Sequence, residues 1–363
     1  MARKLASDKI LFTAFIALAL LGCVMIYSAS APEAARLFGN PYRYLAKQLA
    51  ALIVGLTLAF VVSRVDHRHF RNPAVVYGAL GICLLLCAAV LFRPPINAAR
   101  RWLVFGPLTL QPAEFLKVAL VLFLAYQLDR KRERLDDFVH GVLPAASFLG
   151  LSAAIVLAEP DFGTATSYLI VAGALFFLAG APLRYFLIGA AGCIPVLTLL
   201  VLSAGYRRQR LLAFLHPEAD PLGRGFQAAQ SLIAVGTGGV TGNGLGQSRQ
   251  KLFFLPYPHT DFIFAIVGEE LGFLGAVGVI ALFGIVAWRG LRAARRAPEP
   301  HLAYLAAGAT AMIVLQAAMN LGVVLTLLPT KGIPLPFLSY GGSSLVADCL
   351  AAGILLNVSQ HVT

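Results

Sequence analysis

The chain has 363 residues, of which 59% are hydrophobic and only 13% carry a charged side chain. That composition excludes a soluble globular protein of this length, whose surface would need far more polar residues. The formal net charge of +12 would suggest a nucleic-acid partner in a soluble protein, but here most Lys and Arg stand in short connections between apolar runs, where they set membrane topology.

Apolar stretches of about 20 residues, the length a helix needs to cross a bilayer, recur along the whole chain. The alternating pattern of a transmembrane β-barrel is absent, so the sequence predicts helices. The expected fold class is all-α: a polytopic membrane protein with about ten transmembrane helices, forming a single domain over residues 1–363. The expected spans lie near residues 10–29, 45–63, 73–92, 113–128, 138–158, 162–180, 185–204, 260–288, 301–327 and 341–360.

The basic residues predict the orientation, because Lys and Arg are enriched in short cytoplasmic connections. With ten spans, both termini and the even-numbered connections share one side. That side carries the larger number of basic residues, so both termini are expected in the cytoplasm. The longest connection, at about residues 205–259, is then extracytoplasmic. The basic residues of the predicted cytoplasmic side are Arg3, Lys4, Lys9, Arg64, Arg68, Arg71, Arg130, Lys131, Arg132, Arg134, Arg184, Arg289, Arg292, Arg295 and Arg296.

The sequence QPAEFLK at residues 111–117 opens the fourth expected span and places two charges inside the membrane. Glu114 and Lys117 stand three residues apart and therefore share one helix face. Two interpretations stay open at this point. The residues form a structural ion pair that holds the bundle together, or they line a polar cavity that receives a charged headgroup, because ionisable groups inside a membrane are functional candidates by default.

The sequence EPDFGT at residues 159–164 interrupts the chain between the fifth and sixth expected spans, on the extracytoplasmic side. Pro160 ends one helix, and Asp161 is suited to capping the next. Asp161 is therefore either a helix cap or, with Glu159, part of a polar cavity beside Glu114, Lys117 and Asp261. Several carboxylates at one membrane face would also suit a divalent cation, Mg²⁺ or Mn²⁺, although no cofactor is firmly indicated.

The long connection is expected to be functional, because loops of this length without a domain of their own usually are. It contains a short amphipathic helix expected near residues 224–235, followed by the Gly-rich sequence GTGGVTGNGLG at residues 236–246. These glycines lack the spacing and the Lys-Ser/Thr of a phosphate-binding loop. They are interpreted as backbone that packs closely against helices or a ligand, with Arg249 and Lys251 near enough to contact a pyrophosphate.

The sequence PYPHTDFIF at residues 256–264 joins this polar loop to a strongly apolar span. A carboxylate at the mouth of a membrane segment is costly, and a chain keeps it where a partner, a water-filled cavity or chemistry requires it. Asp261 is therefore predicted to be the general base of a membrane enzyme. Helix geometry places Glu269 about a quarter-turn from the face of Asp261 and Glu270 nearly opposite, so that one of them faces the bundle.

Three prolines within residues 329–336 forbid a continuous helix between the last two expected spans. Non-helical backbone near membrane depth has to be buried or to line a cavity, so residues 329–344 are predicted to form a re-entrant or capping loop at the site. Gln316, Asn320 and Asp348 in the flanking spans are interpreted as groups that form hydrogen bonds between helices.

In this order and at these spacings, the segments resemble the SEDS family (shape, elongation, division and sporulation proteins) of bacterial cell-wall synthesis. The resemblance covers nearly the whole chain, and residues 247–251 and 328–334 look closer to its division-type than to its elongation-type members. One position departs from the family pattern, because Tyr257 stands where an acidic residue is common. The motifs that carry the resemblance are RW (101–102), QPAE (111–114), EPDFGT (159–164), GNGLGQ (242–247), HTDFIF (259–264), GEELG (268–272) and PLPFLSYGGSS (334–344).

The resemblance implies a peptidoglycan glycosyltransferase of the bacterial cytoplasmic membrane with its active site on the extracytoplasmic side. Its substrate would be lipid II, an undecaprenyl-pyrophosphate disaccharide peptide, polymerised into β-1,4 glycan strands with inversion and with Asp261 as the base. Its partner would be a class B penicillin-binding protein, the transpeptidase that cross-links the product. The residues expected to bind substrate are Arg101, Glu114, Lys117, Asp161, Arg249, Lys251, His259, Ser339 and Ser343.

Two other functions stay open. A lipid II flippase would also use many spans, broken helices and interior charges. A transporter should hold its ionisable groups near the midplane, whereas here they are expected at the outer ends of the spans, which favours an enzyme. A scaffold that only recruits and activates its partner would tolerate substitution of Asp261.

Overall fold

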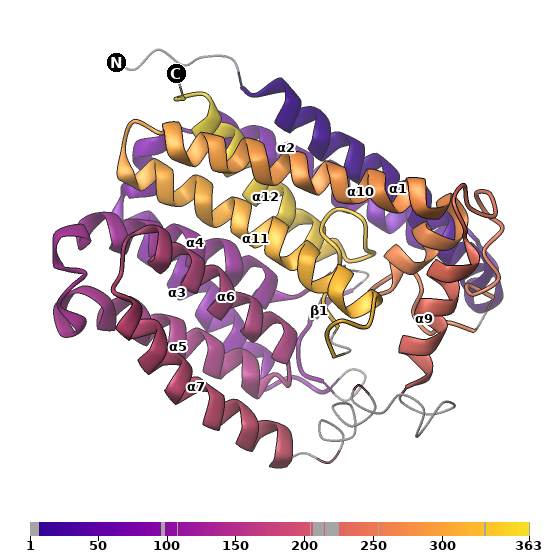
Figure 1. Ribbon diagram of the computed structural model, residues 1–363, viewed down its shortest axis with the longest axis horizontal. Helices are drawn as coiled ribbons and strands as arrows, with labels where there is room; N and C mark the ends of the chain where they lie inside the picture. The colour runs from indigo at the N-terminus through magenta and orange to yellow at the C-terminus, as the bar shows by residue number, and fades with distance from the viewer. Residues whose placement is uncertain are drawn as a thin grey trace.

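The computed structural model describes residues 7–95, 99–106, 108–203, 205, 214, 225–252, 254–329 and 332–362. They form a bundle of long helices with one short β-hairpin (Figure 1), which confirms the all-α class. The shorter elements are η1 (His67–Arg71), η2 (Arg132–Arg134), the π-helical turn η3 (Phe138–Val142), β1 (Leu103–Phe105) and β2 (Leu108–Leu110). The α-helices are α1 (Lys9–Phe38), α2 (Arg43–Arg64), α3 (Pro73–Val90), α4 (Pro112–Arg130), α5 (Leu143–Ala158), α6 (Phe162–Leu178), α7 (Leu183–Ser203), α9 (Phe226–Thr237), α10 (Ile263–Arg296), α11 (Pro300–Val324) and α12 (Gly342–Ser359).

Each of the ten expected spans corresponds to one of these helices, and the short helix expected near residues 224–235 corresponds to α9. Within the described ranges, 7 helices are long and apolar enough to cross a membrane, and α6 is a shorter apolar helix. The first part of the long loop, at residues 206–213 and 215–224, lies outside the described residues. The 7 helices are α1, α2, α3, α5 together with η3, α10, α11 and α12.

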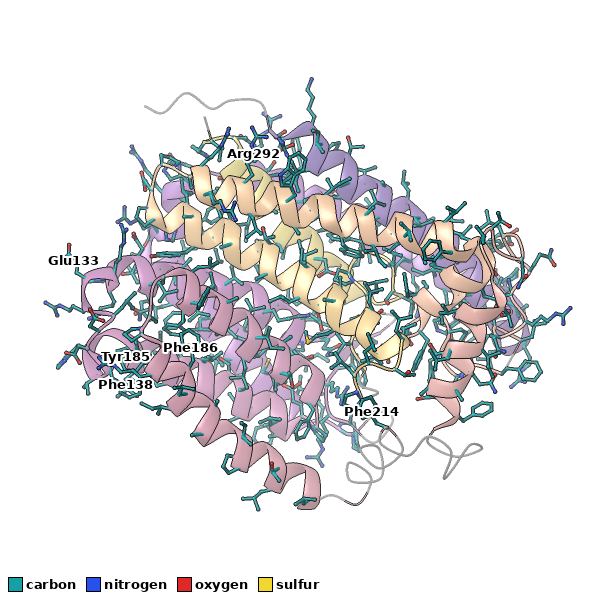
Figure 2. The ribbon with its side chains drawn as sticks, viewed as in Figure 1. Glu133, Phe138, Tyr185, Phe186, Phe214 and Arg292 are labelled. Carbon is teal, nitrogen blue, oxygen red and sulfur yellow. The ribbon has the colours of Figure 1, made fainter. Side chains whose placement is uncertain are left out.

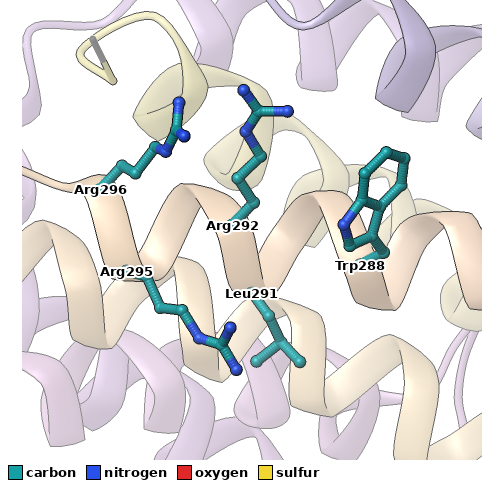
Figure 3. A pocket seen from close by; sticks show the side chains of 5 residues that line it. All are labelled: Trp288, Leu291, Arg292, Arg295 and Arg296. Atoms are coloured by element: carbon teal, nitrogen blue, oxygen red, sulfur yellow. The ribbon is translucent and has the colours of Figure 1, made fainter.

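Helices α1 and α10 are longer than their apolar stretches predict. α1 continues to Phe38, where Gly39 ends it in the left-handed conformation (φ 67°). α10 runs for 34 residues, and its last turns carry Trp288, Arg292, Arg295 and Arg296 (Figure 3). Trp and Arg are typical of the boundary between membrane and water, so α10 leaves the apolar region without ending there.

Helix α4 lies at the centre of the bundle. Almost all of its side chains from Pro112 to Leu128 are buried, and it packs against α3, α5, α6, α11 and α12. A helix that contains Glu114 and Lys117 is tolerated at this depth because protein rather than lipid surrounds it. The edge of the bundle is formed by α7, where the ring of Tyr185 packs on Phe138 with the ring centroids 5.3 Å apart (Figure 2).

Both chain termini lie at one end of the bundle (Figure 1). The backbone N–H of Asp8 donates to the hydroxyl of Ser359, 3.2 Å away, which joins the start of α1 to the end of α12. The guanidinium of Arg289, near the end of α10, contacts the Asp8 carboxylate at 2.5 Å. A chain with an even number of spans has both termini on the same side of the membrane, in agreement with this arrangement.

Candidate active site

Asp261 lies at the end of the bundle opposite the chain termini. It stands two residues before α10, whose far end contacts Asp8 near the N-terminus through Arg289. A helix of this length spans roughly 50 Å at 1.5 Å per residue. His259, in the same turn as Asp261, contacts Glu33 near the far end of α1. The side chain of Asp261 is half-buried, so a ligand at this end can reach it.

Gly332 leaves space beside the Asp261 carboxylate. A Cβ atom at position 332 would stand 3.2 Å from Oδ2 of Asp261, which is tighter than an ordinary van der Waals contact. Any side chain there would press on the carboxylate or fill the space beside it. The segment 332–341 between α11 and α12 is non-helical, as its prolines predicted, and it packs against the Asp261 turn.

The backbone of the Asp261 turn is fixed by three hydrogen bonds from other segments. The side-chain amide of Asn320 donates to the Asp261 carbonyl at 2.8 Å. The hydroxyl of Ser339 donates to the carbonyl of Thr260 at 2.6 Å, and the backbone N–H of Tyr340 donates to the carbonyl of His259 at 2.9 Å. Asn320, expected to form a hydrogen bond between helices, instead holds backbone outside the helices, and Ser339 holds the turn from inside the protein.

Glu114 and Lys117 form a buried ion pair with 2.6 Å between Nζ and Oε2, which confirms the expected pairing. The Lys117 ammonium also donates to Gln316 at 2.7 Å, and the Gln316 amide donates to the carbonyl of Pro334 at 3.0 Å. A chain of polar contacts thus runs from α4 through α11 to the segment beside Asp261. The cavity next to Lys117 measures only about 10 Å³, room for about one water molecule.

Arg101 lies beside Asp161 near the start of α4, and Ser343 contacts Gln111, the residue before that helix. Asp161 caps α6 by accepting the N–H of Thr164 at 3.2 Å, and its Oδ2 lies 3.8 Å from Nη1 of Arg101. Arg101 also donates to the carbonyls of Glu159 and Pro160. The hydroxyl of Ser343 accepts the backbone N–H of Gln111 at 2.9 Å, which joins α12 to the start of α4.

Glu159 is fully buried next to this cluster. Burial, reinforced by the negative charge of Asp161, raises the pKa of Glu159 to about 8, so the carboxyl is largely protonated at neutral pH. Neither of its oxygens has a hydrogen-bond partner within the described part of the chain. Across those same residues there is no group of three or more His, Cys, Asp or Glu side chains that could hold a metal ion, and the expectation of a divalent cation stays untested.

His259 is buried between aromatic rings. Its ring centroid lies 4.7 Å from that of Tyr44 and 5.7 Å from that of Tyr340. Burial lowers the pKa of His259 to about 4, so the imidazole is neutral at pH 7. Glu33 does not offset this effect, because its carboxylate is partly exposed and lies 3.4 Å from Nδ1 without a hydrogen bond. A neutral His259 supports the turn as a packed ring rather than as a cation.

We expect His259 to make the protein less stable as the pH falls. Above pH 6.5 the imidazole is neutral in both the folded and the unfolded chain, so His259 does not lower the free energy of unfolding there. Between pH 6.5 and about 4 only the unfolded chain takes up the proton, which lowers the free energy of unfolding. Thermal unfolding of the purified protein across this range should show the loss, and His259→Gln should reduce it. An unchanged pH profile in that variant would contradict the buried neutral imidazole.

The Gly-rich loop fills a break in α10. Gly272 interrupts the helix with φ 67° and ψ −164°, a conformation open to glycine alone. The carbonyls of Glu269 and Glu270 accept the N–H groups of Asn243 and Gly244 at 3.0 and 3.1 Å. On the other side of the break, the N–H groups of residues 273 and 274 donate to the carbonyls of residues 239 and 240. The loop therefore satisfies the backbone groups that the break exposes, which confirms close packing on a helix.

We expect Gly242→Ala to be destabilising by about 1–3 kcal/mol, from steric overlap and left-handed strain. Gly242 has φ 82°, and a Cβ atom there would lie 2.1 Å from the carbonyl oxygen of Glu270. Gly278→Ala, in the helix α10 that the loop packs against, is the control, because no atom lies within 4 Å of the added carbon. That control should be neutral or slightly stabilising. Thermal unfolding in detergent compares the two, and equal stabilities would contradict the described packing.

Glu269 and Glu270 both lie buried beneath residues 246–251, whereas an unbroken helix predicted only one of them to face the bundle. Glu269 accepts the N–H of Arg249 at 2.8 Å, and Glu270 accepts the N–H of Gly246 at 3.0 Å. The Lys251 ammonium is buried and pairs with Glu270 at 2.8 Å. Lys251 thus holds the loop to the helix, while Arg249 is exposed at its surface. The break at Gly272 explains the difference, since it lets the loop fold over both carboxylates.

Several residues of the site were not identified from the sequence. Gln48 is buried in α2, donates to the carbonyl of Ser339 at 3.3 Å and accepts the N–H of Gly341 at 3.3 Å. Its only signal was an amide inside an apolar stretch. Glu33 lies near the C-terminal end of α1 and Tyr44 at the start of α2, and both contact His259. Nothing local in the sequence indicates that these ends meet the Asp261 turn.

The fold and the site define a polytopic helical membrane protein with a buried ion pair at its centre and a supported carboxylate at the end opposite its termini. A family model described as "Cell cycle protein", covering the FtsW, RodA and SpoVE proteins, matches residues 8–363. The chain belongs to this family, which confirms the resemblance seen in its motifs.

Relatives and solved structures agree with this assignment. The chain is 43% identical to the probable peptidoglycan glycosyltransferase FtsW of Geobacter metallireducens over 98% of this chain and 95% of that protein. It is 41% identical to stage V sporulation protein E of Bacillus subtilis over 99% of this chain and 98% of that protein. Relatives named FtsW favour the division type.

Among solved structures, the chain is similar to one described as "Structural coordination of polymerization and crosslinking by a peptidoglycan synthase complex". The TM-score is 0.79 at 31% identity, covering 98% of each chain. It is also similar to the rod shape determining protein RodA of Thermus thermophilus, with a TM-score of 0.72 at 30% identity over 98% of this chain and 97% of that one.

Proposed function

We propose that this protein is a peptidoglycan glycosyltransferase that polymerises lipid II into β-1,4 glycan strands, with Asp261 as the general base. The observation that carries the proposal is the Asp261 turn: a half-buried carboxylate with space beside it at Gly332, on a backbone fixed by Asn320, Ser339 and Tyr340. Relatives named probable peptidoglycan glycosyltransferase, at about two-fifths identity over nearly the full length, support it.

In the proposed reaction, Asp261 removes the proton from the 4-hydroxyl of the acceptor sugar as that oxygen attacks the anomeric carbon of the donor. The bond from that carbon to the polyprenyl pyrophosphate breaks on the opposite face, so an α-linked donor gives a β-linked product. The pyrophosphate leaves as an anion and needs no protein acid, unlike the leaving group of a glycosidase. A positioned base of this kind contributes about 10²–10⁴-fold to the rate.

The departing pyrophosphate requires cationic groups. Arg249 is exposed on the loop above α10, and Arg101 is partly exposed beside Asp161, so these two guanidiniums are proposed to contact it. Lys117 and Lys251 are held by Glu114 and Glu270 and are proposed to act by organising the site. Glu114, Asp161, His259, Ser339 and Ser343 are assigned the same organising role, and a bound divalent cation would add to the positive charge.

We propose that the Asp261 end faces the extracytoplasmic side. The end that holds both termini also holds Arg292, Arg295 and Arg296, and basic residues are enriched on the cytoplasmic side. A class B penicillin-binding protein is the proposed partner, because a glycan strand made at this end is the substrate for cross-linking. The synthase complex among the similar structures supports such a partnership.

Purified protein in liposomes, with its cognate penicillin-binding protein and lipid II, tests the function. Glycan strands, longer in the presence of Mg²⁺ or Mn²⁺ if a cation takes part, are the expected product. The penicillin-binding protein alone, with its transpeptidase blocked by a β-lactam, is the control. Transfer of lipid II between leaflets without polymer would establish a flippase instead. Absence of both activities in a folded complex would indicate that the protein is a scaffold for its partner.

A further inference from the structure

An apolar groove of about 1090 Å³ runs between α1, α2 and α12 in the half of the bundle nearest the chain termini. Small side chains form its floor, including Ala19, Ala59 and Ala352. Large apolar side chains form its walls, among them Phe12 and Phe60, which are 49% and 61% exposed. The groove lies on the opposite half of the bundle from Asp261 and is distinct from the candidate active site.

Packing elsewhere explains why the helices leave this groove. α2 and α12 are in close contact, because a Cβ atom at Gly353 would lie 2.7 Å from the carbonyl oxygen of Ala59. α1 has few contacts with α12 and packs instead on the segment 332–341, since a Cβ atom at Gly22 would lie 2.3 Å from the carbonyl oxygen of Phe337. The ring of Phe337 packs on Phe15 with the centroids 5.4 Å apart and closes the inner end of the groove.

Polar side chains occur at only one end of the groove, the end nearest the termini. They are Ser7, Ser63, Arg64 and Gln360, and the amide of Gln360 donates to the carbonyl of Ser63 at 3.1 Å. The guanidinium of Arg64 is exposed there and lies over the ring of Phe60. Among the described lining residues, the charged one at this mouth is therefore basic, and the lining away from the mouth is apolar.

We propose that this groove binds one phospholipid with an anionic headgroup. An apolar cavity of ~150 Å³ already takes up a benzene-sized guest, and this groove opens to the bilayer with several times that volume. The acyl chains lie over Ala59 and Ala352 and end beneath Phe337, and the phosphate contacts Arg64. The carrier lipid of the substrate fits less well, because its pyrophosphate belongs at the Asp261 end, in the opposite half of the bundle from this groove.

Native mass spectrometry of the purified protein tests the proposal with two dioleoyl lipids, phosphatidylglycerol and phosphatidylcholine, which share acyl chains and differ in charge. Wild type should retain one phosphatidylglycerol in preference to phosphatidylcholine. Arg64→Gln should reduce that preference by about fivefold while the chains still bind. Ala352→Phe should abolish retention of both lipids, whereas Ala281→Phe, the same change at an exposed position of α10, should not. Equal retention of both lipids by wild type would overturn the proposal.

A second measurement uses the wild-type protein, so it remains valid even if the Ala352→Phe variant fails to fold. Phosphatidylglycerol with a diazirine at the end of one acyl chain is irradiated with the wild-type protein, and the cross-linked peptides are identified. Adducts near Phe15, Phe337 or Cys349 are the expected result. Adducts confined to other helices would place the lipid elsewhere. Displacement of the probe from these sites by undecaprenyl phosphate at equal concentration would assign the groove to the carrier lipid and overturn the phospholipid.

Discussion

Asp261→Asn is expected to abolish glycan synthesis from lipid II while the protein still folds and still binds its penicillin-binding protein. The amide has nearly the same shape as the carboxylate and keeps the backbone position that Asn320 fixes. It cannot accept the hydroxyl proton, so the rate should fall by about 10²–10⁴-fold, the usual contribution of a positioned base. Polymerisation by the purified complex, measured as glycan formed per minute, gives the result.

The matched control for this substitution is Asp136→Asn, which removes an exposed carboxylate from the connection between α4 and α5. It should leave the rate unchanged. Thermal unfolding and co-purification with the partner show whether Asp261→Asn is folded. A folded variant that polymerises at close to the wild-type rate would remove Asp261 from the reaction.

Gly332→Ala examines the same carboxylate without removing it. The added carbon would stand 3.2 Å from Oδ2 of Asp261, so the side chain has to shift by a few tenths of an ångström. Misplacement of a catalytic group on this scale is costly, and we expect a lower kcat with little change in thermal stability. An unchanged kcat would mean that the space beside Gly332 is not where the acceptor binds.

The sequence predicted the spans, the capping role of Asp161 and the Glu114–Lys117 pair because each depends on local features: apolar length, a short polar side chain before a helix, and helical spacing. It could not predict that both Glu269 and Glu270 are buried. Their environment depends on a backbone break at Gly272 and on a loop that returns to fill it. Periodicity assumes a continuous helix and therefore fails where a distant segment supplies the hydrogen bonds.

The same difference between local features and contacts of distant segments applies to Asp261 and the residues that support it. Asp261 was identifiable because a carboxylate between a polar loop and an apolar helix is unusual in itself. The supports Gln48, Glu33 and Tyr44 were not, because they come from segments far from Asp261 in the sequence. Lys251 was expected to contact a pyrophosphate. It pairs instead with the buried Glu270, because the loop folds over α10.

The buried pair of Glu114 and Lys117 provides the second large effect. Lys117→Met leaves the Glu114 carboxylate without its cation inside the bundle, and removal of one partner of a buried pair costs about 3–5 kcal/mol. Replacing both residues, as Glu114→Gln with Lys117→Met, leaves no unpaired charge and should recover most of that loss. The free energy of unfolding in detergent, measured for both single variants and the double variant, gives the coupling between the two side chains.

Activity of the double variant then separates the two interpretations that the sequence left open. Lys117 also donates to Gln316, which donates to Pro334 in the segment beside Asp261, so these contacts connect the pair to the Asp261 turn. If the pair only stabilises the bundle, a double variant that recovers stability recovers polymerisation as well. If its charges organise the site for a charged substrate, the double variant is stable and inactive. A Lys117→Met variant as stable as wild type would contradict both, because a buried carboxylate cannot lose its cation without cost.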